Sequence, residues 1–351
     1  MKDVSMKSAC GVAALGLACT LAAVALSGYA PQPQPGTARI VSAADAFLAT
    51  LTPDQRKREL FAFDDNEQRA RWSNLPTGFV PRAGLSMGQL NVTQRSAAMA
   101  LMAATLSPKG LEKVKEIVEG DEVLKQGSGG RDQNMFGKDL FYISILGTPS
   151  AKTPWMLQFG GHHLALNITI AGEQGILTPS LTGAQPALYT ENGKTIRPLG
   201  AESDKGMALL NSFDETQRKQ AILSFRVADL VLGPGQDGKT IVPEGLKASS
   251  MNAKQKAMLL DLISEWVGIV HEGAANARMK EIKAGLDETW FAWSGSTTVA
   301  LGKNIAAYYR IQGPKLVIEY APQRLGGDLS MHVHTIYRDP TNDYGRGVTG
   351  K

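Results

Sequence analysis

Four of the five histidines in this 351-residue chain form two close pairs. His162 and His163 are adjacent in the stretch GGHHLALN, and one valine separates His332 from His334 in MHVHTIYRD. Imidazole is the usual protein nitrogen ligand for zinc, copper and iron, and a strand that carries His-x-His points both rings to one face. The two pairs therefore predict a mononuclear site for a divalent metal ion, with zinc, copper or iron as candidates.

Both pairs lie in segments with the composition of β-strands, so one sheet could bring them together. Adjacent side chains of a strand face opposite ways, which means that only one of His162 and His163 should join a site with His332 and His334. Alternation puts His162 on the apolar face and His163 on the more polar face, and it does not choose between them. A lone strand histidine is more often a core or surface residue than a ligand, but the grouping of four favours a metal site.

Three charged residues near the second pair are candidate catalytic groups. Glu319 lies among apolar strand residues, where a carboxylate is costly unless it binds a metal, pairs with a cation or orients a histidine. Arg338 and Asp339 follow the His-x-His segment. A three-histidine site with an open position could make hydroxide from water, with Glu319 as the base, whereas copper or iron could bind oxygen. The alternative for Glu319 is an ion pair with Arg310 or Arg338.

The elements around these residues indicate an α+β protein. Residues 43–120 and 203–284 read as two helical blocks, and the segments with strand composition are 140–146, 155–170, 290–300, 306–311, 315–320 and 331–337. Because strands and helices do not alternate regularly, we expect an antiparallel or mixed β-sheet core rather than a parallel one.

Four helix starts share one signature, a capping residue three positions before a glutamine. These starts are Thr52–Gln55, Asn91–Gln94, Asp214–Gln217 and Asn252–Gln255. The residue types and spacing match the capping box. Since the intervals between the starts are unequal, and repeat arrays keep a fixed period, independent helix starts are favoured over an internal repeat.

The first thirty residues have the pattern of a secretory signal. Lys2 and Lys7 precede the apolar run 9–26, and small residues follow before Ala30. We expect a signal peptide at 1–30, a linker at 31–38 and a single α+β domain at 39–351. Cleavage is favoured over an uncleaved anchor, which predicts a periplasmic or secreted protein with no membrane attachment after cleavage.

Cysteine content and charge exclude several classes of function. Both cysteines, Cys10 and Cys19, lie within the predicted signal, so the mature chain would have no disulfide and no thiol nucleophile. The formal net charge is +4 without a block of basic residues, which gives no reason to expect a nucleic-acid partner.

Several long segments occur in a characteristic order, namely LATLTPDQRKRELFAFDD, PWMLQFGGHHLALNITI, TPSLTGAQPA, WFAWSGS, YYRIQGPKLVIEY and HVHTIYRDPTNDYG. With them the chain resembles, over nearly its whole length after the signal, the family of secreted proteins catalogued as domain of unknown function 3500. The resemblance implies no established activity. It implies that the candidate residues form one motif set, made up of His162, His163, Glu319, His332, His334, Arg338 and Asp339.

The chain departs from the family pattern at two places. It has Gly160-Gly161 where the family usually has Glu-Gly before the histidine pair, and Ala321-Pro322 where an acidic residue and asparagine are common. The first departure removes a carboxylate beside the candidate site, which argues against a mechanism that needs an acid there.

Together these patterns predict an exported, metal-dependent enzyme that acts on a small-molecule or polymeric extracellular substrate. Hydrolysis is favoured over oxidation because Glu319 could serve as a base. The alternative is a periplasmic protein that binds a metal or small ligand without turnover, for which a closed shell of four ligands would be expected. A structural envelope protein, with histidines that only form hydrogen bonds in the core, is a third possibility.

Overall fold

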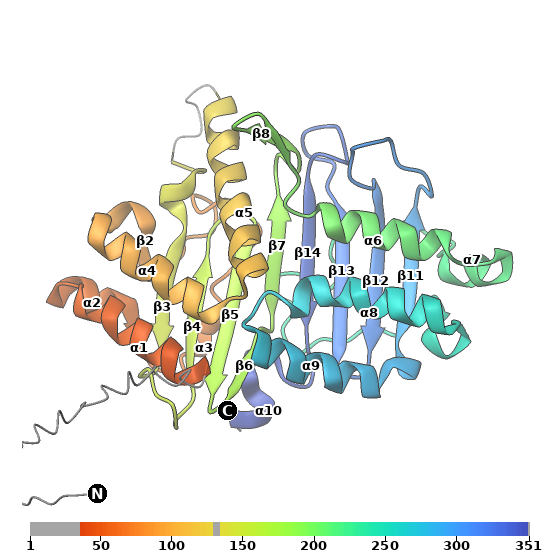
Figure 1. Ribbon diagram of the computed structural model, residues 1–351. Helices are drawn as coiled ribbons and strands as arrows, with labels where there is room; N and C mark the ends of the chain where they lie inside the picture. The colour runs from red at the N-terminus through yellow and green to blue at the C-terminus, as the bar shows by residue number, and fades with distance from the viewer. Residues whose placement is uncertain (1–35, 129–133, 350–351) are drawn as a thin grey trace, which may run out of the picture. The chain divides into compact units, whose positions relative to one another are not determined.

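The computed structural model describes residues 36–128 and 134–349, and Figure 1 shows their arrangement. The predicted signal peptide and both cysteines lie outside the described residues. The helices are α1 (Gly36–Ala49), α2 (Pro53–Glu59), α3 (Asn66–Arg69), α4 (Val92–Thr105), α5 (Pro108–Gly127), α6 (Gly200–Asn211), α7 (Glu215–Ala221), α8 (Ala253–Val267), α9 (Glu272–Ala284) and α10 (Arg346–Thr349). None of these helices has the length and apolar character needed to cross a membrane.

Twelve strands of the described residues form one mixed sheet, and β8 and β9 form a separate hairpin. The strands are β1 (Leu60–Phe61), β2 (Leu85–Ser86), β3 (Tyr142–Leu146), β4 (Trp155–Gly160), β5 (Leu164–Ala171), β6 (Gln174–Ile176), β7 (Ser180–Ala184), β8 (Tyr189–Glu191), β9 (Lys194–Ile196), β10 (Leu246–Lys247), β11 (Trp290–Gly295), β12 (Ala307–Gly313), β13 (Leu316–Pro322) and β14 (Val333–Arg338). The main path through the sheet is β1-β3-β4-β5-β7-β14-β13-β12-β11-β10. The predicted α+β class, with a mixed sheet and two helical blocks, is confirmed.

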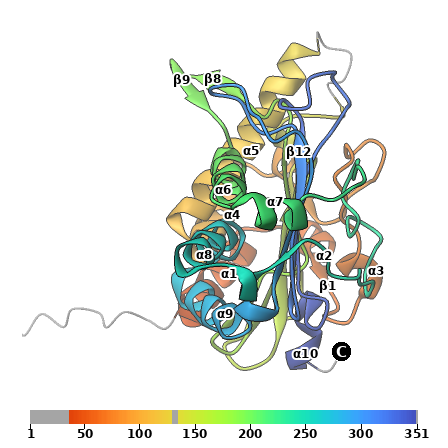
Figure 2. The same cartoon turned by 90° about the vertical axis from the view of Figure 1, so that its right-hand side faces the viewer.

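The two faces of the sheet are covered differently. Figure 2 shows α1, α4, α5, α6, α8 and α9 on one face, and long loops with α3 and α10 on the other. Alternate residues of β5, from Leu164 to Ile170, belong to the large apolar core that also includes residues of the helices. Ala165 instead packs with Trp72 and Ile336 in a small cluster on the opposite face. The helical face therefore holds the main core, and the loop face carries most of the buried polar groups discussed below.

All four predicted capping boxes are present, and they interlock in pairs. The side-chain amides of Gln55 and Gln94 bind each other, and so do those of Gln217 and Gln255. In each pair the second glutamine also donates to a backbone carbonyl that precedes the first helix, at Thr50 or at Ser212. The same local structure thus occurs once in each half of the chain.

The sheet repeats in the same way. The order β3-β4-β5-β7 is followed by β14-β13-β12-β11, which is the same arrangement read backwards. β2 pairs with β3 as β10 pairs with β11, and the parallel pairing of β1 with β3 recurs as a bridge between Ile222 and Trp293. The two halves are therefore an internal repeat, and the prediction of independent helix starts was wrong. Each repeat contains two of the four predicted capping boxes, which is why the intervals between them along the sequence are unequal.

The halves meet at the antiparallel pair β7 and β14 in the middle of the sheet. Thr182 and Thr335 lie opposite each other there, with their hydroxyl oxygens 2.7 Å apart. A second contact joins the helical layers, where Leu106 and Val270 form an antiparallel bridge. The pairing of β7 with β14 places the end of the first repeat beside the end of the second. It also brings the two histidine pairs close together.

Candidate metal centre

The first histidine pair lies in a tight turn rather than inside a strand. The segment 155–170, predicted as continuous strand, is a hairpin in which β4 and β5 pair as far as Gly160 and Ala165. His163 has φ 59°, a left-handed conformation that is uncommon outside glycine. The carbonyl of His163 accepts a hydrogen bond from the Gly183 N–H at 2.7 Å, which ties the turn to β7. Strand alternation therefore does not apply to this pair.

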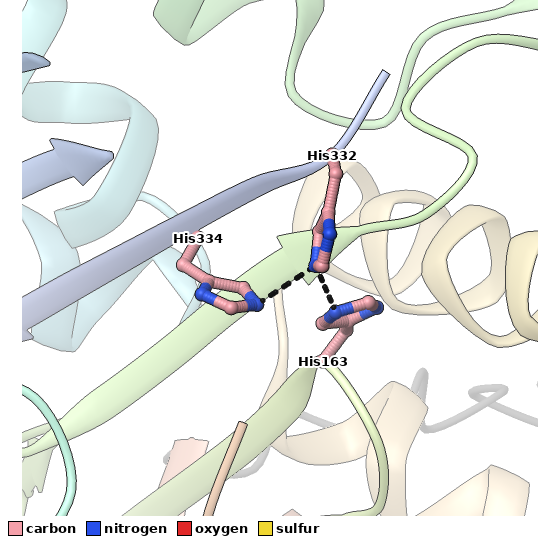
Figure 3. A group of neighbouring side chains, drawn as sticks. All are labelled: His163, His332 and His334. Atoms are coloured by element: carbon pink, nitrogen blue, oxygen red, sulfur yellow. Dashed lines mark hydrogen bonds between the residues drawn. The ribbon is translucent and has the colours of Figure 1, made fainter. Parts of the chain in front are cut away.

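The second pair lies at the start of β14. His334 is in the strand and His332 immediately precedes it, so both rings point to the same side as the His-x-His pattern predicts. Figure 3 shows that the rings of His163, His332 and His334 turn toward one point. His332 Nε2 lies 3.0 Å from His163 Nε2 and 3.1 Å from His334 Nε2. The three side chains are between 1% and 5% exposed.

This arrangement fits a metal ion. One ligand atom from each histidine lies within 4.8 Å of those of the other two. In a tetrahedral zinc site with Zn–N bonds of about 2.0–2.1 Å, neighbouring nitrogens are about 3.4 Å apart. The single lone pair of His332 Nε2 can accept a hydrogen bond from only one of its two neighbours, whereas an ion between the three nitrogens would use a lone pair from each of them. The buried cluster could therefore hold a metal.

Hydrogen bonds on the outer nitrogens hold the rings in place. His332 Nδ1 lies 3.2 Å from the carbonyl oxygen of Leu325, and because a carbonyl only accepts, the proton is on Nδ1 and Nε2 is free. His334 Nδ1 lies 3.2 Å from Asn74 Nδ2 and 3.8 Å from a carboxylate oxygen of Asp229. The His332 contact is typical of histidines that bind metals, because it fixes the ring and its tautomer. At His334 the two neighbours act in opposite directions, since Asn74 Nδ2 donates to a bare Nδ1 whereas Asp229 can only accept a proton from it.

Burial also keeps the three histidines neutral. Loss of hydration lowers the pKa of His163 well below its usual value, and the neighbouring histidines lower it further. Desolvation likewise lowers the pKa of His332 to about 3 and that of His334, where Asp229 opposes the effect. A neutral imidazole presents a lone pair without competition from a proton. The cluster is thus ready to accept a cation at neutral pH.

His162 faces a different partner. Its Nδ1 lies 2.6 Å from Asp121 Oδ1 on α5, while the second oxygen of Asp121 accepts the Gly137 N–H at 2.7 Å. The rings of His162 and His163 are 3.5 Å apart between centroids. Within the described part of the chain, His162 Nε2 has no hydrogen-bond partner. Asp121, His162 and His163 also form a second group close enough to hold an ion, although His162 Nδ1 and Asp121 Oδ1 already bind each other.

Glu319 lies on β13 but binds a loop. Its two carboxylate oxygens accept the backbone N–H groups of Val231 and Leu232, each at 2.7 Å, and one also accepts the Tyr308 hydroxyl at 2.8 Å. Burial raises the pKa of Glu319, and these hydrogen bonds oppose the rise. Arg310, one expected partner, pairs with Glu244 at 2.9 Å. The structure thus places Glu319 under the 231–232 loop and not in the histidine cluster.

Arg338 and Asp339 belong to two further networks. Arg338 donates to the carbonyls of Leu232 and Gly233 and pairs with Asp343 at 2.8 Å. Asp339 pairs with Arg278 of α9, also at 2.8 Å. Of the seven residues predicted for the site, the structure brings together His163, His332 and His334, with His162 stacked beside them.

Sequence reasoning missed the residues that orient the histidines. Asp121 had a detectable signal, because it follows Val114 and Ile117 on the buried face of α5, where an acid is unusual. Asn74, Asp229 and Leu325 lie in loops, and no local pattern marks them.

Comparison with known proteins gives a family but no activity. The sequence model of the family described as protein of unknown function (DUF3500) matches residues 34–346. No curated protein and no solved structure matches the chain.

Proposed function

The chain belongs to the DUF3500 family of proteins of unknown function, and we propose that its three-histidine cluster binds a divalent metal ion and catalyses hydrolysis. The observation that carries the proposal is the convergence of His163, His332 and His334, whose Nε2 atoms meet at 3.0 and 3.1 Å. Zinc is the ion that this ligand set favours, since three imidazole nitrogens are typical of catalytic zinc sites.

The number of ligands favours an enzyme over a binding protein without turnover. Structural zinc sites are closed by four protein ligands, whereas catalytic sites have three and keep one position for water or substrate. In the described residues, no cysteine, carboxylate or fourth histidine belongs to the group formed by His163, His332 and His334. Three protein ligands leave such a position open.

The charge of the ligand set favours hydrolysis over oxidation. Three neutral imidazoles would leave the full charge of a bound divalent ion in place, and such an ion would supply a water that is acidic enough to act as a nucleophile near neutral pH. Non-haem iron oxygenases instead bind their metal through two histidines and a carboxylate. Among the described residues the converging group contains no carboxylate.

His162 takes the role that sequence reasoning gave to Glu319. Both oxygens of Glu319 already accept hydrogen bonds from the 231–232 backbone. Asp121 accepts the proton of His162 Nδ1, which leaves a bare lone pair on Nε2 beside the His163 ring. We propose that His162 Nε2 accepts the proton that is lost during hydrolysis, and that Asp121 holds the ring and stabilises its charged form.

The proposed setting is outside the cytoplasm, with a small-molecule or polymeric extracellular substrate. The support is the charged, apolar and small-residue pattern of the first thirty residues. The N-terminal sequence of the protein exported by a host cell tests this part. A mature chain that begins shortly after Ala30 supports export with cleavage, and a chain that keeps Met1 contradicts it.

Elemental analysis of protein purified without a polyhistidine tag tests the metal site. We expect about one equivalent of metal per wild-type chain, and its loss in the double variant His332→Ala, His334→Ala. The matched control is His271→Ala, which removes the one histidine outside the two pairs and should keep the metal. Thermal unfolding of each variant confirms that it folds. A metal-free wild type in zinc-supplemented buffer, or a double variant that keeps its metal, would contradict the proposal.

A further inference from the structure

A surface groove lies beside the histidine cluster and is lined by residues from the end of α5 and from the segment before β14. Figure 1 shows that α5 ends and β14 begins at the same end of the sheet. Its volume is about 470 Å³, and His332 forms part of its wall. Small-molecule sites typically have volumes of about 300–1,000 Å³. The groove is therefore large enough for part of a substrate and reaches a proposed metal ligand.

The wall of the groove is mainly apolar. Leu124 of α5, Phe136, Leu325 and Met331 line it. Leu325 is 73% exposed and presents its apolar side chain to solvent. Burial of such side chains by a bound group removes apolar surface from water, which is the main favourable term in binding.

The groove carries no free charge in its described lining. Asp328 is the one carboxylate there, and it pairs with Lys303 at 2.7 Å and accepts hydrogen bonds from Ser330. No lysine or arginine is among the described lining residues. The lining residues that the structure describes thus offer nothing to balance a phosphate or carboxylate and suit a neutral group.

Two contacts connect the groove to the histidines. The carbonyl of Leu325 binds His332 Nδ1, so the turn that orients this ring also presents the Leu325 side chain. The ring of Phe136 packs against His162 with centroids 4.9 Å apart. A group bound between Phe136 and Leu325 would therefore lie next to both the proposed metal ligand and the proposed proton acceptor.

We propose that this groove binds an aliphatic or aromatic group of the substrate and holds the bond to be hydrolysed at the histidine cluster. The substrate class is then a neutral ester or amide of an apolar acid. This inference rests on the proposed metal centre for the position of the reacting bond, but the apolar groove itself does not depend on a metal.

The test uses two probes. The first is a series of straight-chain hydroxamates, from acetohydroxamate to octanohydroxamate, titrated into zinc-loaded protein. Hydroxamates bind zinc through their head group, so affinity should rise about fourfold with each methylene that enters the groove. The second probe is the neutral dye N-phenyl-1-naphthylamine, titrated into metal-free protein, where it should bind the groove without help from an ion.

The variants are Leu325→Ser with Phe136→Ser, and the control is Leu301→Ser, which alters a fully exposed leucine outside the groove. We expect the groove variant to lose the dependence on chain length and to bind the dye at least tenfold more weakly, while Leu301→Ser behaves like wild type.

The outcomes separate this inference from the proposed function. Dye binding that the groove variant loses, in a protein that takes up no zinc, would support the apolar groove and contradict the metal centre. Zinc-dependent hydroxamate binding that is the same for every chain length would support the metal centre and overturn the groove. Equal loss of binding in Leu301→Ser would also overturn it.

Discussion

Acid should destabilise the metal-free protein through His332, and the size of the effect follows from its surroundings. Burial lowers the pKa of His332 from its ordinary value of 6.5 to about 3 in the folded chain. As the pH falls below 6.5, the unfolded chain binds a proton at this residue while the folded chain does not. The contribution of His332 to the free energy of unfolding is therefore fully present above that pH, and it is lost progressively as the pH falls toward 3.

Between about pH 7 and about pH 5, this single residue should cost the fold about 2 kcal/mol. The pKa values of His163 and His334 are also lowered, so they add to the loss. Asp343 opposes it, because burial raises its pKa to about 6 and the folded chain then gains a proton first. These other groups are present in wild type and in a variant at 332, so the difference between the two proteins reports on His332 together with its effect on the pKa of His163.

The assay is urea unfolding of wild type and His332→Gln at both pH values, with a chelator present. Wild type should lose about 2 kcal/mol more than the variant on acidification. Added zinc should reduce the loss in wild type alone, since an ion that binds only the folded state adds stability. Equal losses in the two proteins would refute the argument that His332 is buried and neutral.

Three further predictions follow. Asp121→Asn should keep its metal but hydrolyse p-nitrophenyl acetate at least tenfold more slowly than wild type, and an unchanged rate would remove His162 from the mechanism. Glu319→Ala should lower the free energy of unfolding by about 2 kcal/mol or more, since two buried N–H groups lose their acceptor, and should leave metal content unchanged; metal loss would mean that Glu319 supports the centre. Gln94→Ala and Gln255→Ala should destabilise the fold by similar amounts, about 1–2 kcal/mol each in urea unfolding, because they hold equivalent places in the two repeats; a large effect of only one would contradict this equivalence.

The sequence predicted those features that depend on neighbouring residues. The capping boxes need only a cap and a glutamine three positions later, and all four formed. The His-x-His pattern needs only a strand, and it correctly placed His332 and His334 together. The prediction from strand alternation failed at His162 and His163 because the chain reverses direction there. His163 has a positive φ, which no local sequence pattern predicted.

The remaining features depend on contacts between distant parts of the chain. Glu319 binds the backbone of Val231, 88 positions away, and Asp121 lies 41 positions from His162. An acidic residue among apolar strand residues can be recognised in a sequence, but its hydrogen-bond partner depends on how the loops cover the sheet. The sequence therefore predicted a role for Glu319 at the metal site, whereas in the structure its carboxylate binds the 231–232 loop.

X-ray absorption at the zinc edge, measured on zinc-loaded wild-type protein, tests the central claim most directly. Three imidazole nitrogens at about 2.0–2.1 Å and one oxygen from water are the expected ligands, and His163→Ala should change this pattern. A shell of oxygen atoms without imidazole, or no bound zinc, would contradict a metal centre built from His163, His332 and His334.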